Sequence, residues 1–124
     1  MKLHHTEDAP KAAGPYSQAV SSDGWLFTAG QIGIDPATGK LTPGGFEPEA
    51  RQAFTNLLAI LRAAGADFDR VVKTTIYLAD LGDFGRLNRI YSAALGEHRP
   101  ARTTVQVAAL PLGAAIEIDM VARL

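Results

Sequence analysis

The sequence predicts a single α+β domain whose main elements follow the order β-β-α-β-α-β-β. Three observations lead to this prediction. Strand-like segments come in pairs at both ends of the chain, two amphipathic helical segments alternate with strands between them, and no linker or internal repeat divides residues 1–124. Elements in this order place both helices on one face of a sheet, so we expect the other face to lie open.

The first third of the chain predicts an extended lead-in followed by a hairpin. Residues 1–15 are polar and interrupted by prolines. The segments Tyr16–Ser22 and Trp25–Gly33 have the composition of strands, and Asp23-Gly24 between them is a strong two-residue hairpin signal. Residues 35–40, with the sequence DPATGK, predict a further turn.

The remaining elements alternate between helix and strand. The first helix has an apolar stripe at helical spacing and a glycine after its end, the second has Asp83 as a candidate N-cap, and a Pro/Gly turn separates the last two strands. The predicted elements are a helix over Pro48–Ala64, a strand over Val71–Ala79, a helix over Phe84–Leu95 and strands over Thr103–Ala109 and Ala115–Arg123.

Composition excludes several classes of function. Apolar residues make up 47% of the chain and charged residues 20%, which is typical of a folded domain. The net charge of −1 gives no general attraction to nucleic acid or anionic lipid, so we expect neither as a partner. The chain has no cysteine, and its three histidines do not form a metal-binding pattern. The N-terminus lacks the apolar segment of a signal peptide, and we expect a cytoplasmic protein.

Several predicted strands are apolar on both of their sides, as in the segment Val71–Leu78. A sheet face that is apolar but not covered by helices usually packs against another copy of the same chain. We therefore expect a homo-oligomer.

Two polar residues lie where the pattern predicts an apolar environment. Arg102 stands where the loop after Pro100 becomes a strand, which suits bidentate capture of a small carboxylate. An arginine paired with a neighbouring carboxylate would explain the same position. Asn88 interrupts the apolar stripe of the second helix, either as a fixed hydrogen-bonding group near a pocket or as an amide bonded to nearby backbone.

Two carboxylates alternate with apolar residues in the last strand, so Glu117 and Asp119 share one sheet face with Val121. An isolated pair of this kind usually faces solvent, but an oligomer would cover this face. A carboxylate held there would have a raised pKa and could handle a proton or a water near neutral pH. Tyr16 follows Gly14-Pro15, and its ring either fills the core or brings its hydroxyl to the rim of a pocket.

Five blocks of the sequence, in order, resemble the Rid family of reactive intermediate deaminases, also known as YjgF-like proteins and formerly labelled endoribonuclease L-PSP. The resemblance runs from about Ala9 to Arg123. The blocks are GPYSQAV (14–20), AGQI (29–32), VVKTTIYLADLGDF (71–84), PARTTV (100–105) and IEIDMVA (116–122). Five ordered blocks are much more specific than any one of them.

The resemblance implies a chorismate-mutase-like α+β fold, assembled as a homotrimer with its sites in the clefts between subunits. It also implies hydrolysis of enamine and imine intermediates, such as 2-aminoacrylate and 2-iminopropanoate, to 2-keto acids and ammonia, with no metal and no organic cofactor. In this family the residue matching Arg102 binds the substrate carboxylate, and the residue matching Glu117 positions or activates water. Tyr16 completes the expected catalytic set, and the further residues expected to contact the substrate are Gly30, Asn88 and Thr104.

Three positions depart from the best-known branch of the family. Ala29 replaces a serine, Thr104 replaces a cysteine, and Arg99 stands where that branch has an apolar or aromatic residue. These differences leave the substrate preference open, because Arg99 either favours a more acidic substrate or simply faces solvent.

Two other functions remain as alternatives. A non-catalytic protein that binds or senses 2-keto acids would need Arg102 but not Glu117. A ribonuclease or translation inhibitor is a label often attached to this family, but the near-neutral charge and the missing His/Lys cluster argue against it.

Overall fold

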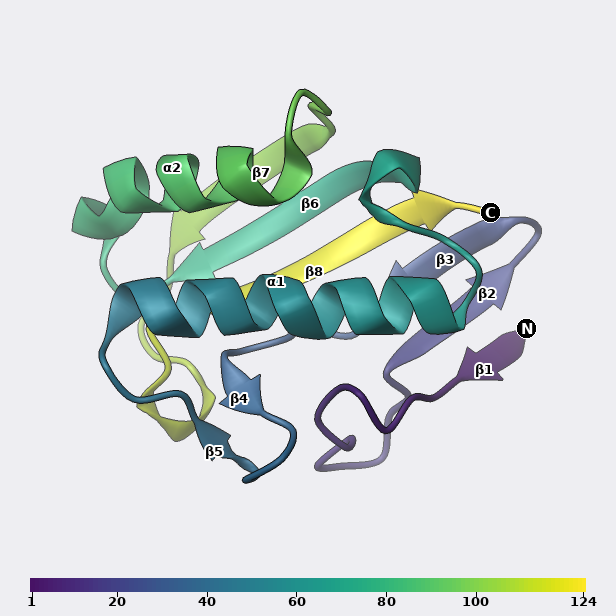
Figure 1. Ribbon diagram of the computed structural model, residues 1–124, viewed down its shortest axis with the longest axis horizontal. Coiled ribbons are helices and arrows are strands. Elements are labelled where there is room, and N and C mark those ends of the chain that lie inside the picture. The colour runs from purple at the N-terminus through teal and green to yellow at the C-terminus, as the bar shows by residue number, and fades with distance from the viewer.

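The computed structural model describes residues 1–124 and has two layers, a six-stranded sheet and two helices that lie together on one of its faces (Figure 1). The strand order is β1-β2-β3-β8-β6-β7, and every neighbouring pair is antiparallel except β6 and β7. The strands are β1 (Lys2–His4), β2 (Ala19–Ser22), β3 (Trp25–Thr28), β6 (Val71–Leu78), β7 (Ala101–Gln106) and β8 (Ile116–Arg123). The helices are α1 (Phe46–Ala63) and α2 (Phe84–Leu95), and neither is long and apolar enough to cross a membrane.

The predicted order of the seven main elements is confirmed, and the structure adds three strands. The predicted turn over residues 35–40 connects a two-stranded hairpin, β4 (Ile34–Asp35) and β5 (Lys40–Leu41). The predicted lead-in contains β1, which pairs with β2 at the edge of the sheet. Three residues carry too little pattern to predict a strand, and β1 forms because β2 offers an unpaired edge.

Several predicted boundaries were wrong. The strand expected from Tyr16 begins only at Ala19, because a tight turn precedes it in which the Tyr16 N–H donates to the Gly14 carbonyl at 2.8 Å. The strand expected to continue to Gly33 ends at Thr28. The strand expected over Thr103–Ala109 begins two residues earlier and ends at Gln106.

Asp83 stands before α2, as predicted, but its side chain does not cap the helix. Its carboxylate instead accepts a hydrogen bond from the Arg86 guanidinium one turn later. Asp80 provides the capping hydrogen bond of this region, since its Oδ1 accepts from the Gly82 N–H at 2.8 Å in the short 3-10 helix before α2. A charged partner at i+3 therefore competes successfully for the expected capping group.

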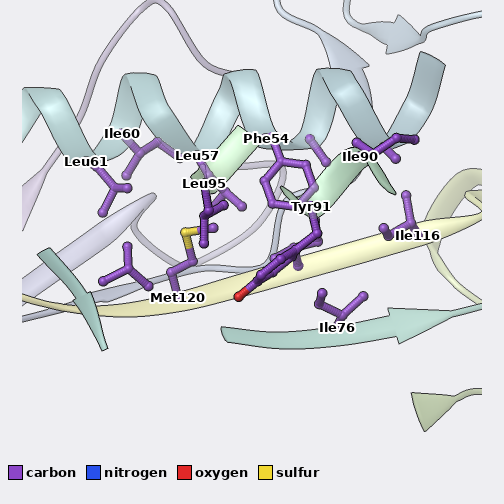
Figure 2. Packing of buried hydrophobic residues seen from close by; sticks show 14 of the residues in the cluster. Phe54, Leu57, Ile60, Leu61, Ile76, Ile90, Tyr91, Leu95, Ile116 and Met120 are labelled. Atoms are coloured by element: carbon purple, nitrogen blue, oxygen red, sulfur yellow. The ribbon is translucent and has the colours of Figure 1, made fainter. Parts of the chain in front are cut away.

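The core lies between the helices and the sheet and contains 22 buried residues. Figure 2 shows side chains of both helices meeting those of β6 and β8: Phe54, Leu57, Ile60, Leu61, Ile90, Tyr91, Leu95, Ile76, Ile116 and Met120. The Phe54 ring meets the Tyr91 ring edge-on at 5.8 Å, and the Tyr91 hydroxyl hydrogen-bonds to that of Thr74 at 3.0 Å. These contacts fix α2 over β6, and with it the helix face that carries Asn88.

The opposite face of the sheet carries no helix, as expected (Figure 1). Large apolar side chains are exposed on it, with Phe27 at 45%, Trp25 at 39% and Val105 at 39% of their free surface. The strand register places Phe27 beside Val121 and places Tyr77 beside Glu117 on the same face. An exposed apolar area of this extent is typical of a surface that contacts another protein chain.

Candidate functional site

Glu117 lies on the open face of the sheet, at the edge of a hollow of about 240 Å³. Tyr16 and Gly30 line the same hollow, together with the lead-in residues 10–13 and Leu112. Three of the residues expected to form the site are therefore brought together by β8 and the loops around β2 and β3.

The environment of Glu117 favours its protonated form. Burial raises the pKa of Glu117 above its usual value, and the nearby Asp119 carboxylate raises it further. No hydrogen bond to a protein group offsets these effects at Glu117. The raised pKa agrees with the sequence prediction, and it makes Glu117 a stronger proton acceptor than a solvent-exposed carboxylate.

Asp119 differs from Glu117 in having partners. Burial raises the pKa of Asp119, but a hydrogen bond from the Tyr77 hydroxyl at 3.3 Å and the charge of Lys73 both act to lower it. Burial together with the Asp119 charge raises the pKa of the Tyr77 hydroxyl, which keeps that hydroxyl a hydrogen-bond donor. These two partners offset only part of the effect of burial, so the pKa of Asp119 stays above its usual value, as does that of Glu117.

Gly30 is in direct contact with the Glu117 side chain. A Cβ atom at position 30 would lie 2.8 Å from the Glu117 Cδ and 3.1 Å from its Oε2. Distances this short exclude every side chain unless the carboxylate moves. Glycine at position 30 therefore leaves the space that the Glu117 carboxylate occupies.

Tyr16 lies at the rim of the hollow rather than in the core, because 54% of its surface is exposed. Its hydroxyl accepts a hydrogen bond from the Ala13 N–H at 3.2 Å. The wall behind it is held by Gln18, a buried side chain that was not predicted from the sequence. Gln18 accepts from the Thr6 N–H at 2.7 Å and donates to the Pro10 carbonyl at 2.8 Å.

Arg102 lines a second hollow of about 240 Å³. Its Nη2 donates to Oδ1 of Asn88 at 2.7 Å, and its guanidinium lies over the Tyr91 ring at 4.8 Å and the Phe84 ring at 5.4 Å. Asn88 is thus a fixed hydrogen-bonding group near a pocket, one of the two roles considered for it, and it orients the arginine. No carboxylate of this chain lies within 4.0 Å of Arg102, so the explanation by a neighbouring ion pair does not hold within the chain.

The two hollows lie on opposite sides of the sheet. Arg102 is in register with Thr74, which is fully buried beneath the helices, whereas Glu117 is in register with Tyr77 on the open face. A single chain therefore does not bring Arg102 and Glu117 to one ligand. Thr104 lines neither hollow, and its buried hydroxyl has no hydrogen-bond partner.

No three His, Asp or Glu side chains come close enough together to hold a metal ion. The largest hollow, of about 550 Å³, lies between α1 and α2 and contains none of the residues expected at the site. All the residues expected at the site except Thr104 therefore line the two smaller hollows.

Two neighbours of the carboxylates, Tyr77 and Lys73, were not predicted from the sequence. Both follow the alternation of β6, and the only available signal was their position on the polar side of that strand. Leu112 was also missed at the rim of the Glu117 hollow, where it is 70% exposed at a φ of 58°, a left-handed conformation that is uncommon for leucine.

Comparison with known proteins shows the family of this chain. The family model described as endoribonuclease L-PSP matches residues 6–124. The chain belongs to this family. The resemblance to Rid proteins inferred from five sequence blocks is thereby confirmed, because solved structures of this fold include one described as RidA from an Antarctic Psychrobacter, with 44% identity, a TM-score of 0.97 and complete coverage of both chains.

Other L-PSP relatives are similar along nearly their whole length. The mouse protein named 2-iminobutanoate/2-iminopropanoate deaminase is 52% identical, with 98% of this chain and 90% of the relative covered. The human protein of the same name is 53% identical, with coverages of 94% and 85%. The structure of Escherichia coli TdcF with bound serine has 38% identity and a TM-score of 0.95, and covers 100% of this chain and 99% of TdcF.

Proposed function

We propose that this protein hydrolyses reactive enamine and imine intermediates, such as 2-aminoacrylate and 2-iminopropanoate, to 2-keto acids and ammonia. The observation that carries this proposal is the 52% identity, over 98% of the chain, to a protein named for deamination of 2-iminobutanoate and 2-iminopropanoate. The bound serine of TdcF supports a site for a small amino-acid-like ligand.

The site is completed between copies of the chain in a homotrimer. The opposite placement of Arg102 and Glu117 supports this, because each lines an open half-site that lacks the other's chemistry. The exposed apolar side chains of the open face, among them Phe27 and Trp25, supply the surface that a second copy would bury. In this arrangement one copy contributes Arg102 with Asn88, and its neighbour contributes Glu117, Gly30 and Tyr16.

The chemistry needs positioning more than a strong nucleophile. Arg102 holds the substrate carboxylate through its guanidinium donors. The Glu117 carboxylate accepts a proton as the oxygen of a water adds to C2 of the imine, and the nitrogen takes up a proton to give a carbinolamine. The C–N bond then breaks as the hydroxyl loses its proton to become the keto group, and the nitrogen takes up this second proton and leaves as ammonia. An enamine first takes a proton at C3 to become the imine. The products are a 2-keto acid and ammonia, and no oxidant or reductant enters.

A competition assay tests the proposed activity. 2-Iminopropanoate is produced from alanine by an amino-acid oxidase in the presence of catalase, and semicarbazide traps the imine that is not hydrolysed. The protein should lower the yield of trapped imine, and Arg102→Ala should not. An unchanged yield at every concentration of the wild-type protein would exclude the activity.

Calorimetry, together with the trapping assay, distinguishes a binding protein from an enzyme. Glu117→Gln should retain affinity for a 2-keto acid such as 2-oxobutanoate, measured by calorimetry, while losing hydrolysis. Affinity in the wild-type protein without any turnover would instead favour the sensing role.

The assembly has its own test. Sedimentation velocity should give the mass of three chains, and Phe27→Glu should shift the protein towards the monomer while abolishing activity, because it places a charge in the proposed interface. An active monomer would contradict a site shared between copies.

A further inference from the structure

The hollow that contains Arg102 has a charge distribution that the proposed reaction on 2-iminopropanoate does not require. Six residues line it: Asn88, Tyr91, Ser92, Arg99, Pro100 and Arg102. Two of these are arginines and none is acidic. A substrate with one carboxylate needs only one of the two guanidinium groups.

Arg99 is held in place by the backbone. Its Nη1 donates to the Gly96 carbonyl and, at 2.9 Å, to the His98 carbonyl, both just beyond the C-terminus of α2. Its Nε and Nη2 have no partner within the chain and remain free to donate. The contacts of Nη1 reduce the freedom of a long side chain, which lowers the entropic cost of using the free donors to bind a ligand.

Neither arginine at this hollow is neutralised by the protein. The arginines Arg51, Arg62 and Arg86 each have a carboxylate within 4.0 Å, but Arg99 and Arg102 have none. The Arg102 guanidinium is oriented by the Asn88 amide and by aromatic rings, which fix its position without removing its charge. Two cations in one small hollow repel each other, and a ligand with two negative groups relieves this repulsion.

We propose that the site accepts imines of acidic amino acids, with Arg102 holding the carboxylate next to the imine carbon and Arg99 holding the second carboxylate. This inference rests on the proposed imine hydrolysis and names a substrate class for the same site. For 2-iminosuccinate the balanced step adds water to C2 and breaks the C–N bond, which gives oxaloacetate and ammonia. Arg99 and Arg102 both line this hollow of about 240 Å³, which is large enough to hold a four-carbon dicarboxylate.

The experiment measures selectivity between two imines. An aspartate oxidase with catalase produces 2-iminosuccinate, an alanine-oxidising enzyme produces 2-iminopropanoate, and semicarbazide competes for both. The quantity compared is the ratio of kcat/KM for the dicarboxylate to that for the monocarboxylate. Loss of one charged hydrogen-bonding group predicts that Arg99→Ala lowers this ratio about tenfold. Arg99→Glu should lower it further, because it places a negative charge beside the second carboxylate.

Arg89→Ala is the matched control, because it removes another exposed arginine, in α2 and outside this hollow. It should leave the ratio within about twofold of the wild-type value, as expected for a surface substitution. Equal losses on both imines in Arg99→Ala would mean that Arg99 only supports the loop before β7, and would overturn the inference. Hydrolysis of 2-iminopropanoate with an unchanged ratio in Arg99→Ala would also overturn it while leaving the proposed function intact. Failure to hydrolyse either imine would reject the proposed function itself.

Discussion

The contact between Gly30 and Glu117 allows the role of the carboxylate's position to be tested without removing the carboxylate. In Gly30→Ala the new methyl carbon would lie 2.8 Å from the Glu117 Cδ and 3.0 Å from its Cγ. Carbon atoms pack favourably at about 3.5–4.0 Å, so the carboxylate must move by about 1 Å. A displacement of about 1 Å at a reacting group can lower the rate about 100-fold.

The same substitution should have little effect on stability. The atoms that must move belong to the end of a side chain that is only partly buried, and the Gly30 backbone does not adopt a left-handed conformation. We therefore expect the free energy of unfolding to change by no more than about 1 kcal/mol, since the lower entropy of the unfolded alanine chain offsets part of the strain. Chemical denaturation measures this change, and the imine-trapping assay measures kcat/KM.

Gly85→Ala is the matched control, because a Cβ atom at position 85 meets nothing within 4 Å and the residue lies in α2. It should keep full activity and gain up to about 1 kcal/mol from the higher helix propensity of alanine. Activity of Gly30→Ala within about threefold of the wild type would refute the inference that the position of Glu117 limits the reaction.

Four further outcomes follow from the site. Arg102→Lys should lower kcat/KM about 10- to 100-fold in the trapping assay, since an ammonium cannot form the bidentate contact with a carboxylate. A wild-type value of kcat/KM would contradict binding of the substrate carboxylate by the Arg102 guanidinium. Asn88→Ala should raise KM about tenfold with a smaller change in kcat, because Arg102 loses the acceptor that orients it, whereas equal changes in both constants would argue against a positioning role. In the pH profile of kcat/KM, activity should fall as the pH drops through the raised pKa of Glu117. Asp119→Asn should move this fall to lower pH, because it removes the negative charge beside Glu117. An unchanged profile in Asp119→Asn would reject Glu117 as the titrating base. The pKa of Glu117 is higher in the folded than in the unfolded chain, so Glu117 contributes to stability below its unfolded-state pKa, and this contribution is lost as the pH rises through its folded-state pKa. Glu117→Gln should therefore raise the free energy of unfolding at neutral pH and raise it less in acid. Urea denaturation at the two pH values measures this difference.

Local patterns were sufficient to predict both helices and the central strands. The apolar stripe of α1 includes Phe54, Leu57 and Leu61, all of which are buried in the core. The alternation in β8 correctly placed Glu117 and Asp119 on one face, because successive side chains in a strand point to opposite sides. These features depend on neighbours within one element, so the sequence contains all the information that they require.

Contacts between distant segments account for what was missed. Gln18 fixes the lead-in through hydrogen bonds to residues 8–12 positions away, which no local pattern marks. The strand β1 likewise depends on an edge that only the folded sheet provides. Asp83 is the exception, since it lost its expected capping role to Arg86, only three residues along the chain.

The sequence by itself determined the α+β class, the helical core and the residue types able to bind a carboxylate and move a proton. Only the tertiary structure decided that Arg102 and Glu117 lie on opposite sides of the sheet. The alternation over Thr103–Val107 predicts a strand, but it does not tell which side of the sheet Arg102 faces, and the parallel register with β6 decides that. The helix α2 connects β6 to β7 across one face of the sheet, and the resulting parallel register places Arg102 beneath the helix. Glu117 lies on the open face, because side chains alternate along a strand and residues paired between neighbouring strands face the same side.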